Sequence, residues 1–220
     1  MILRIAGINH FNPRGRKKLE EWFDQLSSKA KTPPLFVAVE WNKNLFEYVK
    51  EQQRSMFRGL ITNKWPDMSP DLTNELELSL AYEADAHRKA FPSAEVLWLD
   101  VERVDDEGAQ MAVSSYALCR LAMYESFLQG EPMPGDASRA LDLLSKGAID
   151  AASGNQKEML NDARDIQWAD SLISRVKKDD SAWAIAIVGL SHANSKIKDS
   201  MINQIKARAI PGLECIATLL

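Results

Sequence analysis

The chain has 220 residues, and its 27 Lys and Arg against 31 Asp and Glu give a net charge of −4. Apolar residues make up 45% and charged residues 26% of the sequence, which is ordinary globular composition and excludes disordered, collagen-like and coiled-coil proteins. Because the chain is mildly acidic, we do not expect nucleic acid as a partner.

The sequence predicts a soluble, cytoplasmic protein. Its two cysteines, Cys119 and Cys215, lie far apart and form no disulfide framework. The first residues are too soon interrupted by polar side chains to form a signal peptide. No apolar stretch approaches the length of about eighteen residues that a membrane span needs, so we expect no membrane partner.

Apolar strands and amphipathic helices alternate over the first hundred residues. In chain order we expect a strand over 2–6, a helix from Asn12-Pro13 to before Pro33, a strand over 35–39, a helix over 43–59, a helix from Ser69 or Asp71 to about Phe91, and a strand over 94–101. The helix that follows Asn12 begins with a basic cluster of Arg14, Arg16, Lys17 and Lys18. This cluster is more typical of a solvated helix start than of a surface that steers an anionic substrate.

The second half of the chain predicts more helix than strand. We expect helices over about 110–178 that are broken at 130–135 and near Gly154, then a strand over 182–188, a helix over 195–208 and a strand over 213–219. The approximate range 105–160 is therefore a helical insert within one domain over 1–220.

Continuous apolar strands separated by helices predict an α/β fold. We expect a mainly parallel central sheet of about five strands with helices on both faces, because parallel strands need crossover connections and those connections cover the sheet. In such sheets ligands bind outside the carboxyl ends of the strands. The side chains that follow the strands are therefore the candidates for a functional site.

Polar residues follow four of the predicted strands. The first and the late apolar strand both continue into Gly-x-x-His, as Gly7-Ile8-Asn9-His10 and Gly189-Leu190-Ser191-His192, while Glu40 and Asp100 end two others. Two imidazoles and the Glu40 carboxylate are a suitable ligand set for a divalent metal with an open position for water. The alternatives are that the histidines are structural and that Glu40 is a helix N-terminal acid.

The third histidine, His87, lies four residues after Glu83, so a helix would place both on one face. We expect a surface ion pair there in preference to a ligand site. Asp85, His87 and Asp100 receive no fixed role. No nucleophile elbow, Walker loop or dinucleotide-binding motif occurs, so serine-hydrolase and nucleotide-binding functions lack their motifs.

The paired motifs resemble the superfamily that joins TraB and Tiki proteins, ChaN-like haem-binding proteins and erythromycin-esterase-like proteins, with TraB/Tiki as the closest type. The segment Arg164-Asp165-Ile166-Gln167-Trp168-Ala169 is similar to the Arg-Asn-x-x-Met-Ala helix that precedes the second Gly-x-x-His there. The resemblance covers roughly 1–60 and 155–220. Two departures, Gly-Ile-Asn-His in the first motif and Asp165 in place of asparagine, leave metal and substrate open.

The resemblance implies that the two histidine loops and Glu40 converge on one site. Tiki proteins are metal-dependent proteases, the ChaN group binds haem, and the esterase group opens a macrolide lactone. We therefore expect a metal-dependent hydrolase of peptide or ester bonds in which His10, Glu40 and His192 hold Mn, Zn, Co or Fe. Arg164 would bind substrate charge or orient a carboxylate, and Gly7 and Gly189 would shape the cofactor-binding loops.

Three alternatives stay open. Without a metal, His10 or His192 would act as the general base and Glu40 would orient it. A haem or small-ligand binding protein would use a histidine as axial ligand, with Trp41, Trp65 and Trp98 along an apolar slot. A non-catalytic interaction module would bind partners through the helical middle. We expect a small-molecule or peptide substrate, and the sequence is compatible with a homo-oligomer.

Overall fold

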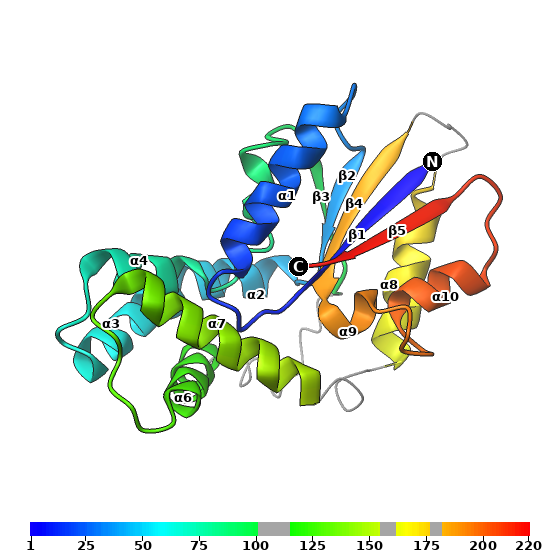
Figure 1. Cartoon of the computed structure of the whole chain (residues 1–220). Helices are drawn as coiled ribbons and strands as arrows, with labels where there is room; N and C mark the ends of the chain where they lie inside the picture. Colours follow the sequence, from blue (N-terminus) through cyan, green and yellow to red (C-terminus); the bar gives the residue numbers. More distant parts are fainter. Residues whose placement is uncertain (101–114, 155–161, 177–181) are drawn as a thin grey trace.

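A five-stranded parallel sheet forms the centre of the molecule (Figure 1). The computed structural model describes residues 1–100, 115–154, 162–176 and 182–220. The strands are β1 (Ile2–Ile8), β2 (Phe36–Val39), β3 (Glu95–Trp98), β4 (Trp183–Gly189) and β5 (Glu214–Leu219), in the spatial order β3-β2-β4-β1-β5. This arrangement confirms the predicted α/β class and parallel sheet.

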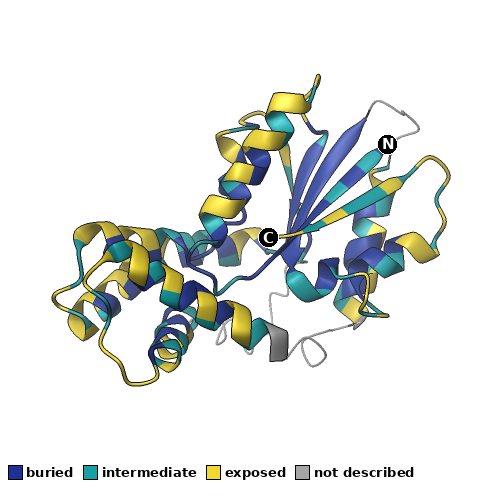
Figure 2. Cartoon of the chain, in the orientation of Figure 1, coloured by how far each residue is buried: buried dark blue, intermediate teal, exposed yellow. Residues whose placement is uncertain are grey.

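Helices cover both faces of the sheet, as the alternating strand side chains require. In β4, Ala184 and Ala186 belong to a core cluster with α8 (Asp162–Ser174) and α10 (Met201–Ala207). Ile185 and Ile187 point the other way, into a cluster with α1 (Gly15–Lys29). Every residue of β4 is buried, and Figure 2 shows this central strand in the colour of buried residues.

A third core lies outside the sheet and is made mostly by helices. It joins α3 (Arg54–Lys64) and α4 (Pro70–Leu78) with α6 (Tyr116–Leu128) and α7 (Ala137–Gly154). The predicted insert over 105–160 contains α6 and α7, although both of its limits fall outside the described residues. We refer to α3, α4, α6 and α7 together as the helical part; it lies beyond the carboxyl ends of the strands in Figure 1.

The helix predicted over 43–59 continues to Lys64. It consists of α2 (Lys43–Tyr48), a π-helical stretch η1 (Val49–Gln53) and α3. The Asn42 side chain begins it by accepting hydrogen bonds from the backbone N–H groups of Asn44 and Leu45. The helix therefore runs from the end of β2 into the helical part.

The helix predicted from Ser69 or Asp71 to Phe91 is wrong in its second half. The Ser69 hydroxyl does cap α4, but that helix ends at Leu78. Ala81 then adopts a left-handed backbone with φ of 48°, and the Arg54 guanidinium donates to the carbonyls of Leu80 and Ala81. This turn replaces the predicted helix with loop and a short 3-10 turn, η2 (Ala86–Arg88).

The remaining elements follow the predicted order with shifted ends. The helix predicted over 195–208 is shorter and begins at Met201, while an unpredicted short helix, α9 (Leu190–Ala193), carries the second Gly-x-x-His. The break over 130–135 separates α6 from α7, and Gly130 adopts φ of 87° there. None of the helices in the described ranges combines the length and apolar composition of a membrane span.

Candidate functional site

The parallel register brings the predicted site residues to one edge of the sheet. Ile8 pairs with Gly189, and Val39 pairs with Ile187, so β1, β4 and β2 end side by side. The backbone N–H of Glu40 also donates to the Ile187 carbonyl at 3.1 Å. His10, Glu40 and His192 consequently meet, as the sequence predicts.

Glu40 is the central carboxylate of the site. Its Oε2 accepts a 2.6 Å hydrogen bond from the Gly189 N–H and lies 3.4 Å from Nε2 of His10. Its Oε1 accepts from Arg164 at 3.3 Å and lies 3.8 Å from Nε2 of His192. Burial by itself raises the pKa of Glu40, but the hydrogen bond and positive charge of His10, together with the positive charge of Arg164, outweigh it and lower the pKa to about 2.

His10 lies between two carboxylates. Its Nδ1 is 2.6 Å from Oε1 of Glu83, which is only 1% exposed, and its Nε2 faces Glu40. Burial lowers the pKa of His10, yet the hydrogen bonds and negative charges of Glu40 and Glu83 hold that pKa well above 6.5. His10 is therefore an imidazolium at neutral pH, and its ring is 26% exposed.

His192 has a different set of neighbours. Its Nδ1 is 2.9 Å from both oxygens of Asp165, a fully buried carboxylate on α8, and its ring packs edge-on against Trp168 at 4.9 Å between centroids. Because an ionised carboxylate only accepts hydrogen bonds, Nδ1 carries the proton. Nε2 lies beyond hydrogen-bonding distance of Glu40, so its lone pair can accept a proton.

Arg164 connects Glu40 to the end of β3. Its guanidinium donates to both oxygens of Asp100, at 2.9 and 3.2 Å, and stacks over the Trp168 ring at 4.4 Å. Trp168 Nε1 donates to the same carboxylate at 3.0 Å. Asp100, which had no predicted role, thus fixes the arginine beside Glu40.

The two motif glycines have different neighbours. A side chain on Gly189 would place its Cβ 3.1 Å from Nε2 of His10 and 3.4 Å from Oε2 of Glu40. A Cβ on Gly7 would instead lie 2.7 Å from Ala193 and from Leu219. Gly189 borders the site, whereas Gly7 lets α9 and β5 approach β1; their cofactor-binding role stays a prediction.

Glu83 and Asp165 are site residues that the sequence reasoning missed. The sequence marks Asp165 only as a departure from asparagine, and Glu83 only as a partner of His87 in a surface pair or, less favoured, a shared ligand site. That surface pair is wrong, because the turn at Ala81 buries both side chains separately. The signal available for Glu83 was weak, since no glycine or asparagine marks the turn.

The other candidates of the sequence lie outside this cluster. Asp85 pairs with Lys50 and Arg88. His87 packs edge-on against Phe23, and burial lowers its pKa to about 4. In the basic cluster, Arg14 pairs with Asp142 and Arg16 with Glu20.

The three tryptophans of the predicted haem slot do not lie in one cluster. Trp41 and Trp98 both pack against Phe46, with ring centroids 6.1 and 5.5 Å away. Trp65 instead packs against the helical core. Haem binding stays a prediction, to which Trp65 lends no support.

The predicted ligands His10, Glu40 and His192 meet, but they do not form a metal site in this arrangement. Across the described ranges, no group of three or more His, Cys, Asp or Glu side chains could hold a metal ion. Both Glu40 oxygens already accept hydrogen bonds, one from Gly189 and one from the positively charged Arg164. A bound metal stays a prediction.

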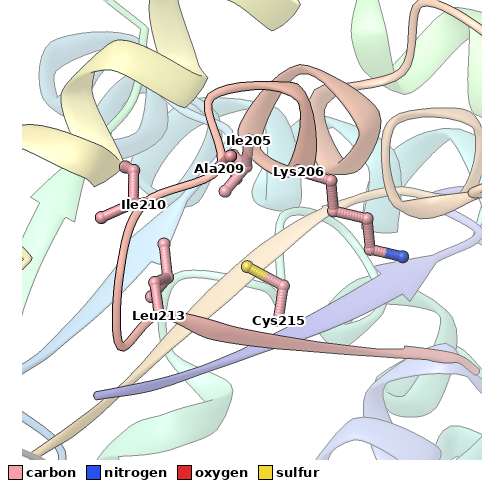
Figure 3. A pocket seen from close by; sticks show the side chains of 6 residues that line it. All are labelled: Ile205, Lys206, Ala209, Ile210, Leu213 and Cys215. Atoms are coloured by element: carbon pink, nitrogen blue, oxygen red, sulfur yellow. The ribbon is translucent and has the colours of Figure 1, made fainter.

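A small pocket lies far from these residues, between α10 and β5 (Figure 3). Its lining is mostly apolar and consists of Ile205, Lys206, Ala209, Ile210, Leu213 and Cys215. Burial raises the pKa of the Cys215 thiol, which disfavours the reactive thiolate. None of the predicted site residues lines this pocket.

Comparisons with known proteins found no matching family model, no matching curated protein and no matching solved structure.

Proposed function

We propose that this protein hydrolyses a peptide or ester bond, with His192 as general base and His10 as general acid. One observation carries the proposal. Each imidazole has its Nδ1 held by its own buried carboxylate, Asp165 or Glu83, and turns Nε2 toward Glu40. Environments that separate the protonation states of two neighbouring groups are typical of acid and base pairs.

The base step belongs to His192. Nε2 of His192 accepts a proton from water while the water oxygen attacks the carbonyl carbon of the substrate, and the carbonyl electron pair moves to the oxygen. Asp165 keeps the proton on Nδ1, so the lone pair stays on Nε2, and it stabilises the imidazolium that forms. Asp165 is thus a positioning residue.

The acid step belongs to His10. As the bond from the carbonyl carbon to the leaving oxygen or nitrogen breaks, Nε2–H of His10 donates its proton to that atom. The products are a carboxylic acid and an alcohol or amine, and solvent exchange moves the proton from His192 back to His10. Glu40 and Glu83 keep His10 protonated before the step.

Arg164 supplies positive charge beside the reacting atoms. Its guanidinium is held on one side by Asp100 and contacts Glu40 on the other. A fixed positive charge next to the carbonyl stabilises the oxyanion that forms during attack. The resemblance implied that Arg164 binds substrate charge or orients a carboxylate; in this proposal it orients Glu40 and stabilises the oxyanion.

The metal-dependent form of this hydrolase is a second proposal. In this form His10, Glu40 and His192 would hold the ion, and the ion would activate the attacking water. It requires Glu40 to give up at least one of its present donors. Haem binding, a purely interacting role, a cytoplasmic location and a homo-oligomer also stay predictions.

The test combines activity with elemental analysis. Wild type and the His10→Ala and His192→Ala variants are screened with ester and peptide substrates, before and after equilibration with Mn, Zn, Co or Fe. Acid–base catalysis is supported if wild type is active without bound metal and each variant loses about 10²- to 10⁴-fold of that activity. About one metal per chain in active wild type, absent from the variants, supports the metal-dependent form.

Three results count against hydrolysis. Wild type without activity under every metal condition contradicts both proposals. A Soret absorption band in the purified protein points to haem binding. Binding of a partner protein that is unchanged in the His10→Ala/His192→Ala double variant points to an interaction module.

A further inference from the structure

We propose that helix α7 positions His10, with Asn12 and Ser145 as the positioning residues. The inference deepens the proposed function and rests on it for the role of His10 as an acid. It concerns α7, a helix of the predicted insert, and the loop that carries His10.

The loop that carries His10 is organised by two asparagine side chains. Oδ1 of Asn9 accepts from the Phe11 N–H at 3.1 Å, and Oδ1 of Asn12 accepts from the Arg14 N–H at 3.0 Å. The backbone N–H of Asn12 also donates a hydrogen bond to the Asn9 carbonyl at 3.0 Å. The His10 backbone thus lies inside a compact turn whose shape these two side chains set.

One face of α7 holds this turn. The Ser145 hydroxyl donates to Oδ1 of Asn12 at 2.7 Å, and the Asn9 amide donates to the Ala148 carbonyl at 2.8 Å. Asn9, Asn12 and Ser145 are all buried. Arg14 adds contacts at the rim, to the Ser138 carbonyl and hydroxyl and to the Asp142 carboxylate.

The contact residues of α7 form a single stripe. Positions 138, 142, 145 and 148 recur every three or four residues, which places them along one side of a helix. The opposite side anchors α7 in the helical part: Ala140 and Leu144 are buried in its core, and a Cβ on Gly147 would lie 2.5 Å from the Phe127 ring. Packing against the helical core therefore holds α7 in place beside the His10 loop.

Glu83 and α7, which both hold His10, are connected to the same helical core. Glu83, which holds Nδ1, follows α4, and α4 belongs with α7 to the same helical core. His192, Asp165 and Arg164 depend instead on β4 and α8. Weakening the contact between α7 and the loop should consequently affect His10 and leave His192 unchanged.

The test is a histidine side-chain NMR experiment on the full chain, because three imidazoles give few signals. His→Gln variants at 10, 87 and 192 assign them. In Ser145→Ala, we expect the Nδ1–H proton of His10 to exchange with water about fivefold faster, the ratio that corresponds to one lost neutral hydrogen bond. We expect the Nδ1–H of His192 to be unchanged, and Ser145→Thr to restore the His10 signal.

The matched control is Ser126→Ala on α6, where an exposed serine hydroxyl donates only to the Met123 carbonyl of its own helix. If Ser145→Ala does not fold, Arg14→Ala replaces it as the test variant, because Arg14 lies at the edge of the contact between the His10 loop and α7. The inference is overturned if the His10 signals stay as in wild type in both Ser145→Ala and Ser145→Ala/Arg14→Ala. It is also overturned if the His10 and His192 signals change equally.

The outcome is independent of whether a substrate is found. If wild type hydrolyses nothing, the proposed function fails while the NMR result still decides whether α7 positions His10. With a substrate in hand, we expect Ser145→Ala to lower kcat about fivefold with little change in KM, and Ser145→Thr to recover it.

Discussion

The sheet and the helical part hold their histidines in different ways. His192 sits on α9 directly after β4, is 6% exposed, and is enclosed by Asp165 and Trp168. His10 lies in a loop, is 26% exposed, and has a carboxylate at each ring nitrogen. The same Gly-x-x-His spacing therefore leaves Nε2 of His192 beyond hydrogen-bonding distance of Glu40, while His10 is held as an imidazolium between two carboxylates.

The largest effect on this difference is expected from Asp165→Asn. An asparagine amide can donate to Nδ1 of His192, which would move the ring proton to Nε2 and remove the base. We expect kcat to fall about 10²- to 10⁴-fold. Nitrogen-15 NMR of His192 reports the tautomer directly; an unchanged tautomer together with unchanged kcat would contradict the role of Asp165.

Glu83→Gln tests the other histidine through pH. Removing one negative charge lowers the pKa of His10, so the alkaline limb of the kcat/KM profile should move to lower pH. The raised pKa also stabilises the folded state, fully below pH 6.5 and less as pH rises through the folded pKa. Urea unfolding should therefore show a larger loss of stability at pH 6 than at alkaline pH.

Glu83→Asp is the matched control for this variant, because it keeps the charge and shortens the side chain. A Glu83→Gln enzyme whose alkaline limb coincides with that of wild type would show that Glu83 does not control His10.

A smaller effect is expected from an alanine at each motif glycine. Gly189→Ala brings a methyl group against His10 and Glu40, and we expect kcat/KM to fall about tenfold. Gly7→Ala meets Ala193 and Leu219, and we expect about 1–3 kcal/mol of destabilisation. Kinetics and urea unfolding of both variants separate the two effects, and equal losses of stability would refute the distinction.

The smallest effect on activity is expected from His87→Gln, since His87 contacts neither of the other two histidines in the structure described. Activity at pH 7 should stay within about twofold of wild type, as for a change away from the site. Because the folded pKa is lowered to about 4, wild type loses stability as pH falls from 6.5 toward 4. This loss should be smaller in His87→Gln, and unfolding curves across that range measure it.

The sheet and the residues at its edge could be predicted because the sequence itself marks where each of these strands ends. The apolar runs before His10, Glu40 and His192 stop at glycine or an acid, and parallel strands bring those ends together. Arg164 follows no strand, and only the resemblance pointed to it. The fold class follows from the same runs.

The residues that tune the site could not be predicted in this way. Glu83 reaches His10 only because Ala81 adopts a left-handed backbone that Arg54 holds from another helix. Such a turn has no local signature when its residue is alanine, since the contact that favours it is distant in sequence. The extent of the helical part was missed for the same reason, because α3 and α4 join α6 and α7 through packing alone.

The alternation of small and large side chains along β4 sets how near a helix can approach. Alanines at 182, 184 and 186 face Trp168, Ala169 and Leu172 of α8, whereas Trp183 and two isoleucines fill the other face. The small alanine side chains thus set the distance between α8 and the sheet, and with it the positions of Arg164 and Asp165 at the sheet edge. For protein engineering, Ala186 is a spacer: a larger residue there would press on α8, the helix of Arg164 and Asp165, without changing any group that performs chemistry.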